Sequence, residues 1–249
     1  MGACGLGIYA IGSREDEDAR VLSAAADALL AQVVAIGRAT PGVRYLETDV
    51  PSAMPHAAVW REALARAGVP EVAVSHTYAL PLEGGERPAG RPLSDKPADA
   101  LTPEALVAAY AATYEGTADE SHRLSPETFA VRLARLKAIP ILDADLAGWR
   151  VAVEGDRPLG LVFASPEAAP HGDPANGWIV EIGTVPAARG QGLGRALLET
   201  GLAALASRGV KRVLARIDDR NAPSVKLHEG AGFVRQPGAS WLYRLVWPG

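Results

Sequence analysis

VPAARGQGLGRALL, residues 185–198, sets the architecture of the chain. An apolar run at 178–184 leads into this stretch, and apolar residues recur at helical spacing after it. The predicted order is therefore strand, glycine-rich turn, helix. Gly190, Gly192 and Gly194 let main-chain N–H groups approach a ligand without a Cβ in the way. Because unpaired N–H donors at a helix N-terminus favour an anion, the turn predicts a phosphate or pyrophosphate site.

Two arginines, Arg189 and Arg195, add positive charge to this turn. A P-loop needs Lys-Ser/Thr after its last glycine, and no such pair follows Gly194. A dinucleotide-binding loop needs Gly-x-Gly-x-x-Gly, and its third glycine would fall on Arg195 or Leu197. The pattern that is filled is Arg/Gln-x-x-Gly-x-Gly/Ala, by Arg189, Gly192 and Gly194. A glycine-rich helix start that binds nothing is the alternative.

A second motif, NAPSVKLHEGAGF, occupies residues 221–233. It is similar to Asn-x-x-Ser-x-x-Leu-Tyr-Glu-x-x-Gly-Phe, which GNAT N-acetyltransferases carry on the helix beside the pantetheine arm of coenzyme A. The matching positions are Asn221, Ser224, Leu227, Glu229, Gly232 and Phe233. His228 stands where the family has tyrosine. With both motifs in order, and a helix and a strand between them, residues 101–249 resemble the GNAT superfamily.

The resemblance implies a fold and a reaction. The fold class is α/β, with a mixed, largely antiparallel central sheet flanked by helices. Acetyl-coenzyme A is the implied co-substrate, without a metal, and its acetyl group passes directly to a primary amine of a small molecule or peptide. The residues implied to bind the coenzyme are Ile182, Gly183, Thr184, Arg189, Gly190, Gln191, Gly192, Leu193, Gly194, Arg195, Asn221 and Ser224. A non-catalytic acyl-coenzyme A sensor or interaction module is the alternative.

Two residues are candidates for proton transfer. The resemblance places Glu181 near the acetyl group, as the base that takes the proton of the amine. Strand alternation puts Glu181 on the face opposite Ile182, although a bulge could change this, and a solvated or salt-bridged glutamate remains an alternative. His228 replaces the tyrosine that usually protonates the leaving thiolate. The ordinary histidine pKa of about 6.5 suits that role, and packing against the coenzyme is the alternative.

The loop between the first two helices of a GNAT fold often covers the acceptor. Thr-Pro-Glu at 102–104 predicts the start of one helix, and Ser-Pro-Glu at 125–127 predicts the start of the next in the same way. Asp119, Glu120 and His122 lie between these starts. We expect them to be either contacts of the acceptor, which would favour a cationic amine, or solvated loop residues.

The N-terminal part contains segments that are similar to segments of the C-terminal part, in the same order. The similar segments are 43–46 with 210–213, 60–69 with 225–233, 78–80 with 243–245, and 11–13 with 182–184. We therefore predict a tandem arrangement, with a degenerate partial GNAT-like domain at 1–82, a linker at 83–100 and the catalytic domain at 101–249. Acidic residues at 15–18 replace the glycine-rich turn, so we expect the first copy to bind no coenzyme. Chance similarity between alanine-rich helices is the alternative.

The composition bears on the binding partners and the cellular location of the protein. The net charge of −4, without a long basic block, argues against nucleic-acid binding. The single cysteine, Cys4, cannot form an internal disulfide, and no signal peptide is predicted before Arg14, so we expect a cytoplasmic protein. No uninterrupted apolar run reaches about 18 residues, so no membrane partner is expected. The remaining expectation is a monomer or homodimer that acts on an amine.

Overall fold

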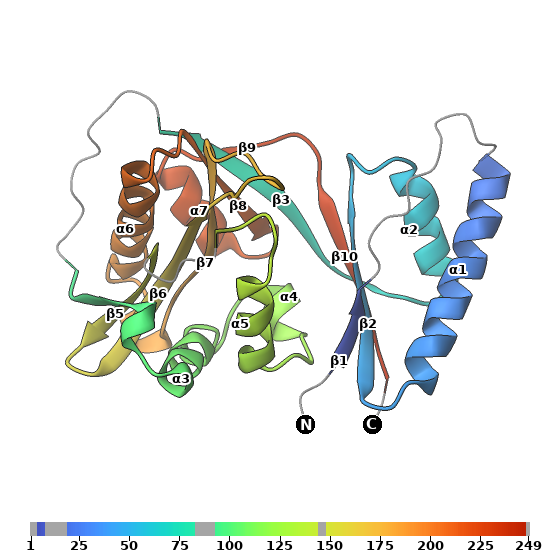
Figure 1. Ribbon diagram of the computed structural model, residues 1–249, viewed down its shortest axis with the longest axis horizontal. Helices are drawn as coiled ribbons and strands as arrows, with labels where there is room; N and C mark the ends of the chain where they lie inside the picture. Colours follow the sequence, from blue (N-terminus) through green and yellow to red (C-terminus); the bar gives the residue numbers. More distant parts are fainter. Residues whose placement is uncertain (1–3, 8–18, 83–92, 144–147, 248–249) are drawn as a thin grey trace.

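The computed structural model describes residues 4–7, 19–82, 93–143 and 148–247 (Figure 1). The first part of the chain contains β1 (Cys4–Gly7), α1 (Ala19–Ala39), β2 (Val43–Pro51), α2 (Ala57–Arg66) and β3 (Glu71–Pro81). The second part begins with β4 (Asp95–Pro97), α3 (Pro103–Thr113), α4 (Glu120–Arg123), α5 (Phe129–Lys137), β5 (Trp149–Glu154) and β6 (Arg157–Pro166). It continues with β7 (Asn176–Thr184), α6 (Leu193–Ser207), β8 (Arg212–Asp218), α7 (Ala222–Gly230), β9 (Val234–Arg235) and β10 (Ser240–Val246).

All described strands belong to one sheet. Their order is β1-β2-β10-β3-β8-β7-β6-β5-β4, and β9 pairs with β3 beside this path. The pairs β1–β2 and β7–β8 are parallel, and the other neighbours are antiparallel. The predicted α/β class with a largely antiparallel sheet is confirmed.

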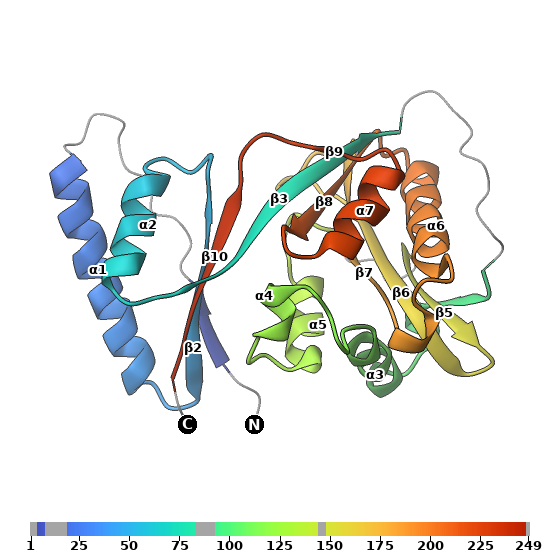
Figure 2. The ribbon, with the colours of Figure 1, turned by 180° about the vertical axis from the view of Figure 1, so that it is seen from behind.

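Helices cover both faces of the second part, as the two opposite views show (Figures 1 and 2). On one face, Leu202 of α6 packs in a core with Val213 of β8. On the other, Tyr110 of α3 packs with Trp149 and Phe163, which come from β5 and β6. These side chains are fully buried, so the two cores fix the helices on either side of β7.

A third core lies in the first part, where Leu30 of α1 and Leu64 of α2 pack with Leu46 of β2. Arg20–Ala39 is apolar and long enough, by length and composition alone, to cross a membrane, with a mean hydropathy of 1.5. Core helices can have the same composition, and α1 contributes Leu30 to this core. The expected absence of a membrane partner stays a prediction.

The element order β1-α1-β2-α2-β3 of the first part matches β7-α6-β8-α7-β10 of the second, apart from the two-residue β9 between α7 and β10. Ser75 of β3 pairs directly with Ser240 of β10, 165 residues later, which is the separation found between Tyr78 and Tyr243 in the sequence. The two helices α2 and α7 also end alike. Gly68 and Gly232 both have positive φ, of 70° and 94°, at equivalent positions.

Each part of the chain gives a strand to the other. β3 pairs with β8 of the second part, and β10 returns to lie between β2 and β3. Ser75 faces Asp218 on one side of this exchange, and Ser240 faces Pro51 on the other. Figure 1 shows the two long strands crossing between the parts. The sheet is therefore continuous across the predicted domain boundary.

Within the predicted linker 83–100, Asp95–Pro97 form β4 and pair with β5, so this portion belongs to the sheet. Residues 83–92 lie outside the described residues, as do the acidic run 15–18 and the segment 11–13. The domain boundaries themselves stay predictions. α1 does not end at its internal glycine but continues to Ala39. Gly37 lies inside the helix, where a Cβ would come within 2.5 Å of the Trp247 ring.

Candidate active site

A cleft opens where β7 and β8 separate. The two parallel strands pair only from Asn176 to Ile179 and from Arg212 to Ala215, and they diverge beyond those residues. The cleft has a volume of about 750 Å³ and is lined by the end of β7, the start of α6, α7 and the segment from Thr113 to His122. Most of the predicted coenzyme-binding residues line it.

The glycine-rich turn forms one end of this cleft. Gly190 and Gly192 have φ of 74° and 81°, a conformation that favours glycine, and a Cβ there would meet no atom within 4 Å. α6 begins directly after Gly192, which has no side chain to cap it. In the part of the chain that the structure describes, the backbone N–H groups of 190–195 have no hydrogen-bond acceptor. This arrangement fits the predicted anion site.

The arginines of the turn have specific protein partners. The Arg189 guanidinium donates hydrogen bonds to the carbonyl oxygens of Thr113, Glu115 and Gly116, at 3.3, 2.5 and 3.4 Å. Arg189 therefore binds the carbonyl end of α3, where a positive charge is favourable. Arg195 donates to the carbonyl oxygen of Gly230 at 2.6 Å. The sequence predicted only that these two arginines help to bind phosphate. The structure shows that they also hold neighbouring segments of the backbone.

Two predicted coenzyme contacts, Gln191 and Leu193, do not line the cleft. The Gln191 amide donates to the carbonyl oxygen of Ala187 at 2.8 Å, and Leu193 packs against the α6 core. At the other wall, Asn221 caps α7 by accepting a hydrogen bond from the N–H of Ser224 at 3.3 Å. The side chain of Asn221 therefore has a structural role in starting α7.

His228 is 1% exposed and lies in the cleft wall, with its ring edge-on to Phe233. Its Nδ1 lies 2.9 Å from the carbonyl oxygen of Ser224, so this nitrogen is the donor. Nε2 is buried and has no partner among the described residues. Burial lowers the pKa of His228 and outweighs the Ser224 hydrogen bond, so the ring is neutral at neutral pH. Nε2 then presents a lone pair, and donation from it requires prior protonation.

Glu181 sits at a bulge in β7. Phe163 of β6 pairs with Glu181, but the next residue, Ala164, pairs with Ile179, which leaves Val180 as the extra residue. Ile182 packs on the α6 side, whereas the carboxylate of Glu181 reaches α3. The prediction that Glu181 lies opposite Ile182 holds, and the bulge is present as well. Gly183 follows on the α3 side, where a Cβ would come within 2.9 Å of Thr113.

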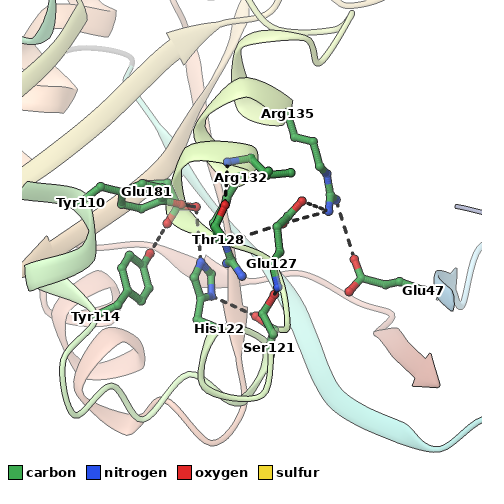
Figure 3. A network of polar contacts seen from close by, with 12 residues as sticks. Glu47, Tyr110, Tyr114, Ser121, His122, Glu127, Thr128, Arg132, Arg135 and Glu181 are labelled. Atoms are coloured by element: carbon green, nitrogen blue, oxygen red, sulfur yellow. Dashed lines mark hydrogen bonds and ion pairs between the residues drawn. The ribbon is translucent and has the colours of Figure 1, made fainter. Parts of the chain in front are cut away.

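Three donors surround the Glu181 carboxylate, which is 8% exposed (Figure 3). The hydroxyl of Tyr110 donates to Oε1 at 2.6 Å, and the hydroxyl of Tyr114 donates to Oε2. Nε2 of His122 lies 3.4 Å from Oε1. On its other side, Nδ1 of His122 lies 3.0 Å from a carboxylate oxygen of Asp119, and the ring stacks on Tyr114. His122 thus lies between two carboxylates.

The cluster shifts the pKa of each member. Burial alone would raise the pKa of Glu181, but the charge of His122 and three hydrogen bonds outweigh it and lower the pKa. Burial alone would lower the pKa of His122, but Glu181 and Asp119 raise it to about 9. At neutral pH we therefore expect a charged imidazolium between ionised carboxylates. Burial and the nearby Glu181 raise the pKa of Tyr110 and Tyr114, so both remain neutral donors.

The segment before α5 differs from its prediction. Ser-Pro-Glu at 125–127 was expected to start a helix, but α5 begins at Phe129 with Thr128 as its N-cap. A four-residue helix, α4, occupies the predicted loop instead, and Asp119 caps it by accepting from the N–H of His122. Asp119 and His122 line the cleft, whereas Glu120 pairs with Arg123 and does not.

Sequence reasoning missed Tyr110 and Tyr114. Both lie on α3 and point at Glu181, and only their spacing of four residues, which puts them on one helix face, hinted at a shared role. Among the described residues, no group of three His, Cys, Asp or Glu is arranged to hold a metal ion. The prediction of a metal-free site stays open to test.

Relatives of known name resemble parts of this chain. A mycothiol acetyltransferase from Renibacterium salmoninarum is 36% identical over 112 residues, covering 44% of this chain and 33% of the relative. A second one, from Thermomonospora curvata, is 33% identical over 156 residues, covering 58% and 50%. The chain thus spans between a third and a half of these two relatives.

Solved structures share the fold at low identity. A GCN5-related N-acetyltransferase from Sphaerobacter thermophilus has a TM-score of 0.57 at 20% identity, covering 82% of this chain and 61% of that one. A tandem GNAT protein from the clavulanic acid biosynthesis pathway has a TM-score of 0.54 at 17% identity, covering 92% and 70%. The model of the acetyltransferase (GNAT) family matches residues 109–233, half of the chain, and this protein belongs to that family.

Proposed function

We propose that this protein is an N-acetyltransferase that moves an acetyl group from acetyl-coenzyme A to a primary amine of a small molecule or peptide. The observation that carries the proposal is one cleft with two ends. The glycine-rich turn at one end offers unpaired N–H groups, and a buried carboxylate, Glu181, lies at the other. A coenzyme whose pyrophosphate binds at the first end would bring its acetyl group to an amine at the second end, between β7 and β8.

The residues present fit acetyl-coenzyme A, which supplies an acetyl group activated as a thioester when it is bound. The N–H groups of 190–195 would hold its pyrophosphate, since they lack protein acceptors. Beyond Ile179, the edge of β7 that faced β8 has no strand partner in the described residues. Backbone donors around 182–184 would therefore be free to stabilise negative charge on the reacting oxygen.

Glu181 would attract the amine, which releases its ammonium proton to solvent before it attacks, and Glu181 would then accept the second proton from the attacking nitrogen. Its lowered pKa makes it a weak base for a free amine. Acceptance becomes favourable once nitrogen bonds to the acyl carbon, because the nitrogen is then far less basic. Tyr110, Tyr114 and His122 would hold the carboxylate in place and keep it ionised. His228, neutral and with a free Nε2, would face the leaving sulfur, and to protonate it His228 must first be protonated itself.

The first part of the chain would be a degenerate GNAT-like copy that binds no coenzyme. The position equivalent to the cleft is a cavity of only about 20 Å³, lined by Trp60, Leu64 and Met54 among others. By the repeat of the two helix ends, Trp60 stands in place of Ser224 and Leu64 in place of His228. Their bulk supports one coenzyme site per chain, with the copies at 1–82 and 101–249.

The acceptor would be a small-molecule amine. Relatives named mycothiol acetyltransferase support this class, and the carboxylates of Asp119 and Glu181 at the acceptor end suit an amine that arrives as a cation. The net charge of −4 does not favour a nucleic acid as partner. We further propose a cytoplasmic monomer or homodimer.

The test is acetyl-coenzyme A turnover against a panel of primary amines, read as release of free thiol. Glu181→Gln should bind the coenzyme as the native protein does and lose most turnover, because general base catalysis contributes about 10²–10⁴-fold. Glu167→Gln is the matched control. Glu167 is a 7% exposed carboxylate outside the cleft that accepts hydrogen bonds from Trp178 and the Asp173 N–H. Tight coenzyme binding with no turnover of any amine would favour a sensor and contradict the proposal.

A further inference from the structure

A buried arginine from the far end of the chain reaches the helix that carries His122. Arg244 of β10 is 4% exposed, and its Nε donates to Glu47 of β2 at 2.7 Å. Its Nη2 donates to the carbonyl oxygen of Ser121 at 3.1 Å. Ser121 lies in α4, one residue before His122. Figure 3 labels Ser121 and Glu47, and it shows that Glu47 also pairs with Arg135 of α5, at 3.7 Å.

The equivalent place in the other part of the chain has no such pair. Arg244 and Glu47 face each other across β10 and β2, and the corresponding neighbours across β3 and β8 are Ala79 and Leu214. The equivalent strand pair therefore forms with two apolar residues at this position. A buried ion pair also gives little or no stability over apolar residues of similar size. Holding β2 and β10 together therefore does not explain why Arg244 and Glu47 are charged, and the contact of this pair with α4 indicates another role.

The position of α4 depends on contacts with the rest of the protein. It has only four residues, and helices this short gain little from internal hydrogen bonds. Two described contacts from the sheet fix its backbone: the carboxylate of Asp218 accepts from the N–H of Glu120 at 3.0 Å, and Arg244 donates to Ser121. The first contact comes from β8 and the second from β10, and the two hydrogen bonds are made to successive residues of α4.

We propose that Arg244, held by Glu47, is a positioning pair that sets α4 so that His122 and Asp119 meet Glu181. The first part of the chain would thereby complete the acceptor end of the cleft, although none of its described residues lines that cleft. The kinetic consequence rests on the proposed function, whereas the geometric one does not. Displacing a site by about 1 Å can cost as much as 10²-fold in rate.

The decisive variant is the double substitution Arg244→Ala with Glu47→Leu, which rebuilds the apolar pair of the other part and leaves no buried charge alone. Arg66→Ala is the matched control, because Arg66 pairs with Asp27 between α2 and α1 and touches nothing in α4. We expect kcat/KM for the acceptor to fall about tenfold to a hundredfold in the double variant. The dissociation constant of acetyl-coenzyme A should stay within about twofold, and the control should match the native protein.

The second readout needs no turnover. NMR titration of the ring protons of His122, assigned with His122→Gln, reports the contacts of the ring with Asp119 and Glu181. The pKa of His122 should move from about 9 toward the ordinary 6.5 in the double variant and stay unchanged in the control. If no amine is acetylated, the proposed function fails, and this titration still tests the positioning pair.

Two results would overturn the proposal: a folded double variant whose His122 pKa equals that of the native protein, or one whose kcat/KM lies within about twofold of it. If the double variant does not fold, Arg244→Lys replaces it. A lysine keeps the charge opposite Glu47 but cannot donate to Glu47 and Ser121 through a planar fork. The same losses are expected from it, and native behaviour in both readouts would equally contradict the role.

Discussion

His122 should make the stability of this protein depend on pH above neutrality. The perturbation is His122→Gln, which removes the titrating ring between Asp119 and Glu181. The pKa of His122 is raised to about 9 in the folded protein, whereas the ordinary value is 6.5. A raised pKa stabilises the fold fully below pH 6.5, and this contribution disappears as pH rises through 9. The difference corresponds to about 3 kcal/mol.

The carboxylates of the cluster do not disturb this window. Neighbouring charges and hydrogen bonds lower the pKa of Glu181 and lower that of Asp119 to about 2, against the burial that would raise both. Their contribution is present above their unfolded values, near 4, and is lost only as pH falls through the folded ones. Between pH 6 and pH 10, His122 is thus the member of the cluster that changes charge.

The assay is urea unfolding followed by tryptophan fluorescence at intervals from pH 6 to pH 10. The native protein should exceed His122→Gln in unfolding free energy most at pH 6, and that excess should shrink by about 3 kcal/mol by pH 10. His171→Gln, a substitution of an exposed histidine outside the cluster, is the control. An excess that stays constant within about 0.5 kcal/mol across this range, or grows with pH, would refute the ion-pair interpretation.

Three further outcomes follow from the cleft. Gly192→Glu should abolish acetyl-coenzyme A binding in a folded chain, because it places a carboxylate among the N–H groups of the turn. Unchanged affinity by calorimetry would contradict the assignment of the turn as the pyrophosphate site. Native protein should bind one coenzyme per chain, because Trp60 and Leu64 fill the equivalent cavity, and a ratio of two would contradict this. His228→Phe should keep coenzyme affinity and lower kcat at least tenfold, with His228→Tyr recovering part, whereas a rate-limiting chemical step within about twofold of native would assign His228 to packing.

Local sequence signals predicted the order of strand, glycine-rich turn and helix that forms one end of the cleft. The three glycines, the strand before them and the Asn cap of α7 act within a few residues of one another, so spacing carries their geometry. The repeat was proposed because similar segments, such as those around Tyr78 and Tyr243, lie about 165 residues apart in the sequence.

The acceptor end was harder to predict. Tyr110 and His122 meet Glu181 only because α3 and α4 fold against β7, and no spacing in the sequence records that contact. Arg189 was assigned to phosphate alone because the carbonyl oxygens that it binds belong to a distant helix end. The start of α5 was misplaced because Ser125 and Thr128 are both good caps. Thr128 caps α5, whereas the Ser125 hydroxyl accepts a hydrogen bond from the N–H of Glu127 before the helix begins.

The exchange of β3 and β10 shapes how this chain must be made. β3 is synthesised long before the strands that pair with it. Ser75 leaves the ribosome well over a hundred residues before its partners Asp218 of β8 and Ser240 of β10. During that interval β3 has two open edges, which invite pairing with other chains. Such long-range pairing also slows folding. Expression of the first 82 residues alone would remove β8, β9 and β10, which all pair with β3, so the nascent half is better regarded as a folding precursor than as a module that can be transplanted.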